Sequence, residues 1–201
     1  MVSAVKKNSG YSLIELMVAS TISLIALGFV SSVFLSGYKL NSQRSLELMV
    51  AQDLNDTLKM MKEDIVRAGY NEGMGSSFVI TGTDPSMVVH LSPSPPAIAN
   101  CISYGYYDGT KKYYRSYYKS NNRLNVLTSE TSTIDVNGLC KNGKSIFDYK
   151  KINVNAFDIK TKMITKGGVT SQLITLDIDV SSVGSQISNK KSVTIQTRNW
   201  G

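Results

Sequence analysis

The feature that most constrains this chain is an uncharged stretch near its N-terminus. No Asp, Glu, Lys or Arg occurs from Leu16 to Tyr38, a run of 23 residues that Glu15 and Lys39 flank. About 20 consecutive apolar residues are enough for a helix to cross the hydrocarbon core of a bilayer. The segment therefore predicts a membrane anchor, and a cleaved secretory signal is the alternative.

The residues on either side of this run argue against a secretory signal. Beyond the run, only Ser36-Gly37 offers a small-residue cleavage site, and it matches the secretory pattern weakly. Before the run lies a polar stub of ten residues, Met1 to Gly10, which carries Lys6 and Lys7. The junction at the end of this stub is the more specific pattern, because glycine is followed there by an aromatic residue, a glutamate and the apolar run.

The string Gly10-Tyr-Ser-Leu-Ile-Glu15 resembles the class III signal of type IV pilins and type II secretion pseudopilins. The resemblance implies that a prepilin peptidase cuts between Gly10 and Tyr11, methylates the new N-terminus at Tyr11 and leaves the apolar helix attached. The family usually has phenylalanine at this position, and Tyr11 keeps the aromatic ring. The resemblance also implies that the Glu15 carboxylate neutralises the N-terminal amine of a neighbouring subunit during filament assembly. An ionisable group at the edge of a membrane-spanning helix is costly, which fits a functional position.

The resemblance further implies the partners and the location of the chain. The expected partners are other major and minor pilins, contacted through the N-terminal helix, together with the prepilin peptidase and the inner-membrane assembly platform. Lys6 and Lys7 hold the stub in the cytoplasm, so the residues after Lys39 lie outside. In a Gram-negative cell this gives a single-pass inner-membrane protein with a periplasmic head, carried later in a pilus on the cell surface. The two cysteines, Cys101 and Cys140, can form a disulfide in that compartment.

A second apolar pattern continues the helix beyond the anchor. Apolar residues recur there at intervals of three or four with polar residues between them, which predicts an amphipathic helix that packs on a globular head. The helix is expected to run from about Ser12 to Arg67 and to stop at the glycines that begin with Gly69. The apolar positions are Leu46, Val50, Leu54, Leu58, Met61 and Ile65.

The rest of the chain predicts a head made mostly of β-strands. Apolar and polar residues alternate over 173–180 and 193–197, as in half-buried strands. The fold class is therefore α+β, a pilin fold in which a long N-terminal helix packs on an antiparallel β-sheet head. Hairpin turns are expected at Asp108-Gly109, Asn142-Gly143 and Gly167-Gly168, and loops at Pro93–Pro96 and Ser181–Lys191. The predicted organisation is a leader peptide over 1–10, a transmembrane and filament-core helix over 11–38, an amphipathic helix over 39–69 and a periplasmic head over 70–201.

Short strings at the end of the helix and near the C-terminus narrow the resemblance. Residues 64–70 (DIVRAGY) and 197–199 (TRN) are similar to minor pilins of the PilW type and their pseudopilin-J relatives. Major pilins usually have their cysteine pair close to the C-terminus, whereas Cys140 lies 61 residues from the end, which favours a minor subunit. A minor type IV pilin that primes or supports pilus assembly is the leading hypothesis. A minor pseudopilin of a type II secretion system is the alternative, because it shares these motifs.

Residues 101–123 have an unusual composition, with seven tyrosines and five basic residues against one acid, Asp108. Interleaved aromatic and basic residues are typical of proteins that bind single-stranded nucleic acid, so a DNA-binding or surface-binding pilus subunit is a third hypothesis. We favour a structural interpretation, a hairpin whose rings pack on the helix and whose lysines protect a sheet edge. The candidate binding residues are Lys111, Lys112, Tyr113, Tyr114, Arg115, Tyr117, Tyr118 and Lys119.

The sequence predicts no enzyme activity, no cofactor and no metal site. His90 is the only histidine, which leaves no choice of base for a catalytic triad. Asp177 and Asp179 share one strand face, but a calcium site needs six or more oxygens. The formal net charge of +7 fits an anionic partner and plain solubility equally well.

Overall fold

The computed structural model describes residues 12–130, 134–166, 169–185 and 187–198 of the chain. It divides into two compact units, Met1–Ser45 and Leu46–Gly201. The predicted leader peptide and the junction between Gly10 and Tyr11 lie outside the described residues.

One helix, α1 (Leu13–Ile65), contains 53 residues. Every residue from 13 to 48 is exposed, and burial of a continuous helix face begins at Val50. The predicted amphipathic pattern describes this face well except at Leu46, which is 38% exposed. The helix ends at Ile65, two residues before the expected end, and the chain turns at Gly69. Gly69 has a φ of 82°, a conformation that glycine adopts without strain, and its N–H donates to the Gly105 carbonyl. The buried helix residues are Val50, Leu54, Thr57, Leu58, Met61 and Ile65.

The head contains two antiparallel sheets, whereas the sequence predicted one. The first sheet has five strands in the order β1-β2-β3-β4-β5, and the second has three in the order β6-β7-β8. A short 3-10 helix, η1 (Val136–Gly138), lies between β4 and β5. The strands are β1 (Val89–Ser92), β2 (Cys101–Tyr107), β3 (Lys112–Ser120), β4 (Arg123–Glu130), β5 (Lys144–Ser145), β6 (Ile152–Lys166), β7 (Val169–Ser182) and β8 (Ser188–Gln196).

The turns agree with the sequence in part. Asp108-Gly109 connects β2 and β3, and Gly109 has the positive φ that such a turn requires. Asn142-Gly143 is not a hairpin turn, because it lies in the irregular segment between η1 and β5. The expected loop Ser181–Lys191 is too long, because β7 continues to Ser182 and β8 begins at Ser188. Lys166 pairs with Val169 at the end of the β6–β7 hairpin, and the expected turn Gly167-Gly168 between them lies outside the described residues.

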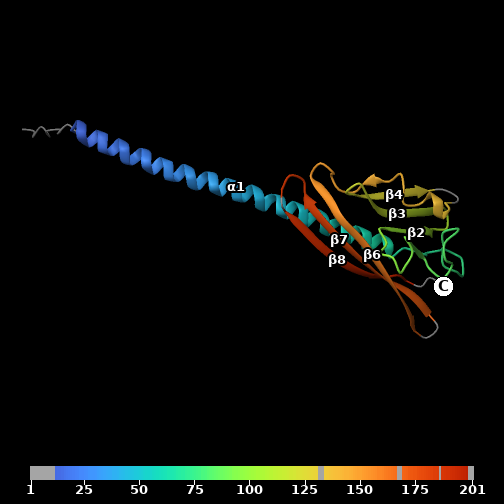
Figure 1. Cartoon of the computed structure of the whole chain (residues 1–201). Helices are drawn as coiled ribbons and strands as arrows, with labels where there is room; N and C mark the ends of the chain where they lie inside the picture. The colour runs from blue at the N-terminus through green and yellow to red at the C-terminus, as the bar shows by residue number, and fades with distance from the viewer. Residues whose placement is uncertain (1–11, 131–133, 167–168, 186, 199–201) are drawn as a thin grey trace, which may run out of the picture. The chain divides into compact units, whose positions relative to one another are not determined.

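The main core joins α1 to both sheets. The buried face of α1 packs in one cluster with Tyr104 and Tyr117 from the five-stranded sheet and with Phe157 and Ile178 from the three-stranded sheet. In Figure 1, the part of α1 that belongs to the second unit lies alongside the strands of both sheets. Burial of the apolar side chains in this core is the main stabilising contribution to the folded head.

Gln172 on β7 connects the two sheets by hydrogen bonds. Its side chain is almost fully buried; Nε2 donates to the Val89 carbonyl at 3.0 Å, and Oε1 accepts from the Val89 N–H at 2.9 Å. The amide therefore bonds to Val89 on β1 as a neighbouring strand would, and no buried polar group of this pair is left unsatisfied.

A smaller core covers the opposite face of the five-stranded sheet. It consists of Phe78, Ile80, Tyr114 and Leu139. Gly105 on β2 leaves room for the Phe78 ring, because a Cβ atom at this position would lie 2.5 Å from Phe78 Cε1. Both faces of β2 and β3 are therefore covered, one by α1 and the other by the segments around Phe78 and Leu139.

Candidate functional site

The first turn of α1 contains Glu15, the residue that the sequence singles out for assembly. Its side chain is exposed, and Oε2 accepts a long hydrogen bond of 3.4 Å from the backbone N–H of Ser12. A carboxylate in the first turn interacts favourably with the positive end of the helix dipole. A bond of this length is weak, so the carboxylate can exchange it for a stronger cationic partner.

The N-terminal part of α1 exposes a continuous series of large apolar side chains. Between Leu13 and Leu40 these side chains are at least 52% exposed. Among the described residues, α1 is the helix that is long and apolar enough to cross a membrane. Apolar surface on this scale requires lipid or the apolar face of another protein. The exposed side chains include Leu16, Ile22, Leu24, Leu27, Phe29, Val33, Phe34 and Leu35.

The predicted pairing of Cys101 and Cys140 is confirmed. The disulfide joins β2 to the segment after η1, with 6.1 Å between the Cα atoms and a sequence separation of 39. In the loop-closure model, a crosslink of this length stabilises the fold by about 4 kcal/mol through the unfolded chain. The crosslink fixes an irregular segment on a regular strand.

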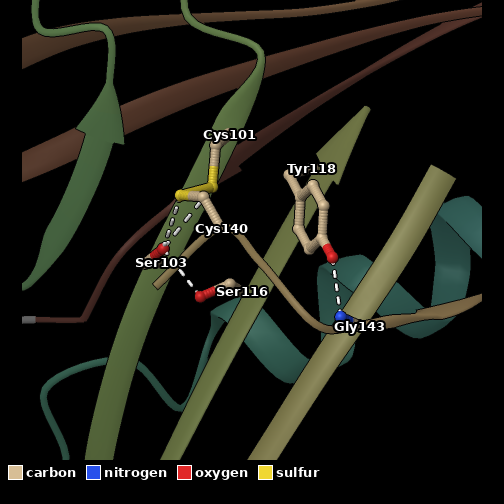
Figure 2. Close-up of a disulfide and its surroundings, with 6 residues drawn as sticks. All are labelled: Cys101, Ser103, Ser116, Tyr118, Cys140 and Gly143. Atoms are coloured by element: carbon tan, nitrogen blue, oxygen red, sulfur yellow. Dashed lines mark hydrogen bonds between the residues drawn. A yellow bond between two sulfur atoms is a disulfide. The ribbon is translucent and has the colours of Figure 1, made fainter. Parts of the chain in front are cut away.

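Hydrogen bonds around the disulfide hold the same segment on the sheet (Figure 2). Ser103 Oγ lies 3.6 Å from both sulfur atoms and donates to Ser116 Oγ at 2.8 Å. The Gly143 N–H donates to Tyr118 Oη at 2.6 Å. A Cβ at residue 143 would lie 2.8 Å from the Val126 backbone, so this close approach requires glycine. Asn142-Gly143 is thus a packing element and not a turn.

The tyrosine-rich segment forms the β2–β3 hairpin, and most of its rings are inside the protein. Tyr104 and Tyr117 are fully buried on the face toward α1, whereas Tyr114 and Tyr118 are buried on the opposite face. Of the basic residues, Arg115 pairs with Asp64 of α1, and the exposed Lys111 lies 3.3 Å from Glu130.

These positions do not support the nucleic-acid interpretation of the hairpin. Base stacking requires accessible rings, and Tyr114, Tyr117 and Tyr118 are buried. Lys112, Tyr113 and Lys119 are half-buried. The expectation that the lysines protect a sheet edge is wrong, because β3 is an interior strand between β2 and β4.

Sequence reasoning missed Asp64, which is the polar centre of this region. Its carboxylate accepts hydrogen bonds from Arg115 Nη1 and from Tyr117 Oη, the second at 2.6 Å. Burial, and then the hydrogen bond to Asp64, raise the pKa of Tyr117. Burial, and then the neighbouring Tyr117, raise the pKa of Tyr104. The sequence did contain one signal for a buried acidic residue: Asp64 lies beside Met61 and Ile65, which belong to the predicted apolar face of the helix.

The other residues weighed in the sequence occupy ordinary structural positions. His90 is half-buried on β1, where burial lowers its pKa. Asp177 pairs with Lys160 at 3.5 Å, and Asp179 accepts a hydrogen bond from Asn155 at 3.0 Å. Over the described part of the chain, no group of three or more His, Cys, Asp or Glu side chains is arranged to hold a metal ion.

Comparison with protein families gives two matches. The model described as "Prepilin peptidase-dependent protein B" matches residues 43–199, which is more than half of the chain. The chain belongs to the prepilin peptidase-dependent protein B family. The model of the prokaryotic N-terminal methylation motif matches residues 5–31, a range that includes Gly10, Tyr11 and Glu15. No curated protein and no solved structure matches the chain.

Membership in the prepilin peptidase-dependent protein B family confirms the resemblance to type IV prepilins. The long helix and the antiparallel sheets likewise confirm an α+β, pilin-like fold. The family therefore has a type IV pilin-like role, and the N-terminal apolar helix fits a membrane anchor. The closer likeness to the PilW type and its pseudopilin-J relatives stays a prediction.

Proposed function

We propose that this member of the prepilin peptidase-dependent protein B family is a minor type IV pilin that primes or supports assembly of a pilus. The observation that carries the proposal is the helix segment from Leu13 to Leu40, whose large apolar side chains are exposed. The match to the methylation motif, over residues 5–31, includes the first part of this segment. Lipid can cover this surface before assembly, and the helices of other pilins can cover it afterwards. Close packing of apolar helices replaces lipid contacts at little cost.

The proposed pathway begins in the inner membrane. Prepilin peptidase removes residues 1–10 and methylates Tyr11, while the head lies in the periplasm. Assembly on the inner-membrane platform brings the helix against other major and minor pilins, and the subunit reaches the cell surface in the pilus. The Cys101–Cys140 disulfide supports an oxidising compartment for the head.

The proposed role is structural and not enzymatic. His90, the only histidine of the chain, is a half-buried residue of strand β1, and burial lowers its pKa.

The position of the disulfide supports a minor subunit. Both cysteines precede the three-stranded sheet in the sequence, whereas major pilins usually have their cysteine pair close to the C-terminus.

Deletion of the gene tests the proposal, with surface pili, protein secretion and DNA uptake scored in one strain. We expect fewer pili, with secretion retained, and recovery of piliation on complementation with the wild-type gene. Normal piliation with lost secretion would instead assign the chain to a type II secretion system. Normal piliation and secretion with lost DNA uptake would favour a DNA-binding subunit of the pilus.

A further inference from the structure

Two adjoining turns of the head expose apolar and basic side chains together. The turn before β6 contains Tyr149, Lys150 and Lys151, and the turn between β7 and β8 contains Val183. The Val183 N–H donates to the Lys151 carbonyl at 2.8 Å, which holds the two turns together. Tyr149 is 47% exposed and Val183 is 44% exposed, so neither belongs to the core. Apolar groups exposed on adjoining turns among polar residues are typical of a contact surface.

Arg123, at the start of β4, belongs to the same surface. Its guanidinium carbon lies 3.9 Å from the centroid of the Tyr149 ring, and the residue is exposed. The acidic residue beside the first turn is Asp148, whose Oδ2 lies 3.9 Å from Lys151 Nζ and compensates one positive charge. The turn 183–187 contains no charged residue, so the surface stays basic. This surface, the basic rim, consists of Arg123, Tyr149, Lys150, Lys151 and Val183.

The basic rim lies at the end of the second unit where α1 enters that unit. Lys191, near the start of β8, donates a hydrogen bond to Asn55 of α1 at 2.5 Å. Arg198, beyond the end of β8, lines a cavity together with Gly75 from the segment that follows α1. Strand β8 therefore runs in the same direction as α1, and the turn that contains Val183 lies toward the start of the helix. Figure 1 shows the β7–β8 turn at that end of the second unit.

The length of the chain keeps this end of the head close to the bilayer that holds the anchor. The uncharged run ends at Tyr38, and the second unit begins at Leu46, eight residues further on. A fully extended chain covers at most about 3.6 Å per residue, so these eight steps span about 29 Å at most. A tethered surface meets its partner at a high effective concentration, so even a weak attraction keeps the two in contact.

We propose that the basic rim binds the anionic phospholipid surface of the bilayer that holds the anchor. Each lysine or arginine near an anionic membrane favours the attached state by about fivefold. Tyr149 suits the membrane–water interface, because its ring is apolar and its hydroxyl is polar. Val183 adds apolar contact at the level of the headgroups. The inference rests on the membrane-anchored state of the proposed function and adds a second contact between the chain and the lipid.

The position and spread of the charges favour lipid over a protein partner at this surface. The anchor keeps the bilayer within reach of the basic rim at all times, whereas another subunit must first be brought there. Lipid phosphates also form an extended layer of negative charge, which suits basic residues that are spread over two turns and the start of a strand.

The test uses the full chain in nanodiscs of neutral phosphatidylcholine, and in nanodiscs of phosphatidylcholine mixed equally with anionic phosphatidylglycerol. Brief acetylation followed by mass spectrometry measures how fast each lysine reacts. Lys150 and Lys151 should react about fivefold to tenfold more slowly in the anionic nanodiscs. High salt screens the attraction and should remove the difference. Lys162, which is exposed near the other end of β6, should react equally in both kinds of nanodisc.

A pair of variants tests whether the protection depends on the basic rim. Arg123→Gln removes one charge of the rim, and Lys111→Gln removes the same charge beside the turn between β2 and β3. Both side chains are exposed, so both variants should fold. Arg123→Gln should reduce the protection of Lys150 and Lys151 about fivefold, whereas Lys111→Gln should leave it unchanged.

Several results would overturn the proposal. The first is equal reaction of Lys150 and Lys151 in the two kinds of nanodisc, and the second is protection that Arg123→Gln and Lys111→Gln reduce equally. Protection that appears only when two or more chains share a nanodisc would assign the basic rim to a second copy of the chain. A chain that does not enter nanodiscs would remove the anchor, and with it the proposed function. Normal entry with unprotected lysines would leave the proposed function standing.

Discussion

The Asp64 carboxylate accepts hydrogen bonds from Arg115 and Tyr117, which lie 51 and 53 residues further along the chain. Asp64 is in the last turn of α1, where the helix dipole disfavours a negative charge. The side chains of Asp64 and Arg115 are only 13% and 26% exposed, so water compensates the charge poorly. Arg115 and Tyr117 therefore supply the compensation and fix the end of α1 on the five-stranded sheet.

Asp64→Ala should destabilise the head by about 2–4 kcal/mol, because it leaves a partly buried guanidinium and the Tyr117 hydroxyl without their acceptor. Urea denaturation monitored by near-ultraviolet circular dichroism measures this loss of unfolding free energy, since the signal reports the packing of the tyrosines. Tyr117→Phe removes one hydrogen bond and leaves the ion pair, so it should cost only about 1 kcal/mol.

The control for Asp64→Ala is Glu130→Gln, which breaks the Lys111–Glu130 pair. Those side chains are 60% and 51% exposed, so the loss should stay within about 0.5 kcal/mol. If Asp64→Ala and Glu130→Gln destabilise the head equally, the Asp64 carboxylate does not stabilise it more than an exposed ion pair does.

Alkaline pH should unfold the head through its buried tyrosines. Burial and the hydrogen bond to Asp64 raise the pKa of Tyr117 above its ordinary value of 10.0, and burial raises the pKa of Tyr104 in the same direction. Because both pKa values are higher in the folded state than in the unfolded chain, their contribution is complete below pH 10. It is lost as the pH rises through the folded-state pKa values.

The ultraviolet absorbance of tyrosinate measures this behaviour during a pH titration. Tyr104 and Tyr117, two of the 11 tyrosines in the chain, should ionise only as the head unfolds. The stability of Tyr117→Phe should fall less steeply above pH 10. Ionisation of Tyr104 and Tyr117 near pH 10, with the head still folded, would refute the expected shift.

Local patterns explain which parts of the structure the sequence could predict. The buried face from Val50 to Ile65 repeats at helical spacing, so neighbouring residues alone identify it. The disulfide was predictable because the chain offers only two cysteines. The β8 strand was partly missed because it is a sheet edge on which only Ile195 is buried, so its lysines and serines resemble a loop.

The arrangement around Asp64 could not be predicted, because it depends on contacts between distant residues. Tyr114 and Tyr117 point to opposite faces of β3, and both are buried because α1 covers one face and the segments around Phe78 and Leu139 cover the other. A strand buried on both faces loses the alternation that distinguishes inside from outside. The sequence alone therefore left Tyr114 and Tyr117 as candidates for a binding surface.

Processing should occur between Gly10 and Tyr11, within the range of the methylation motif. N-terminal sequencing or intact mass of the membrane-extracted chain should give a mature protein that begins with N-methylated Tyr11. Gly10→Glu should leave an uncut precursor in the inner membrane, whereas Gly28→Ala, inside the helix, should be cut normally. A mature chain that begins at Met1, or one cut near Gly37, would refute the prediction.

Glu15 should be needed for assembly and not for the stability of the head. Glu15 lies in the unit Met1–Ser45, whereas the core of the head lies in the unit Leu46–Gly201. Glu15→Ala should therefore be processed and retained in the membrane, with an unchanged urea denaturation of the head. It should be recovered poorly in sheared pili, and Glu15→Asp should be recovered at an intermediate level. Glu63→Ala, which removes an exposed glutamate near the other end of α1, is the matched control and should assemble normally.

The physical reason is the change in surroundings that assembly imposes on the Glu15 carboxylate. In the proposed membrane-anchored state this group would lie at the aqueous edge of an apolar helix. Its hydrogen bond of 3.4 Å from the Ser12 N–H is weak. In a bundle of apolar helices an unpaired carboxylate costs several kcal/mol, so it requires a cationic partner. The N-terminal amine of an adjoining subunit is such a partner, and removal of residues 1–10 creates it. If Glu15→Ala enters pili as well as Glu63→Ala does, this pairing is not how the subunit docks.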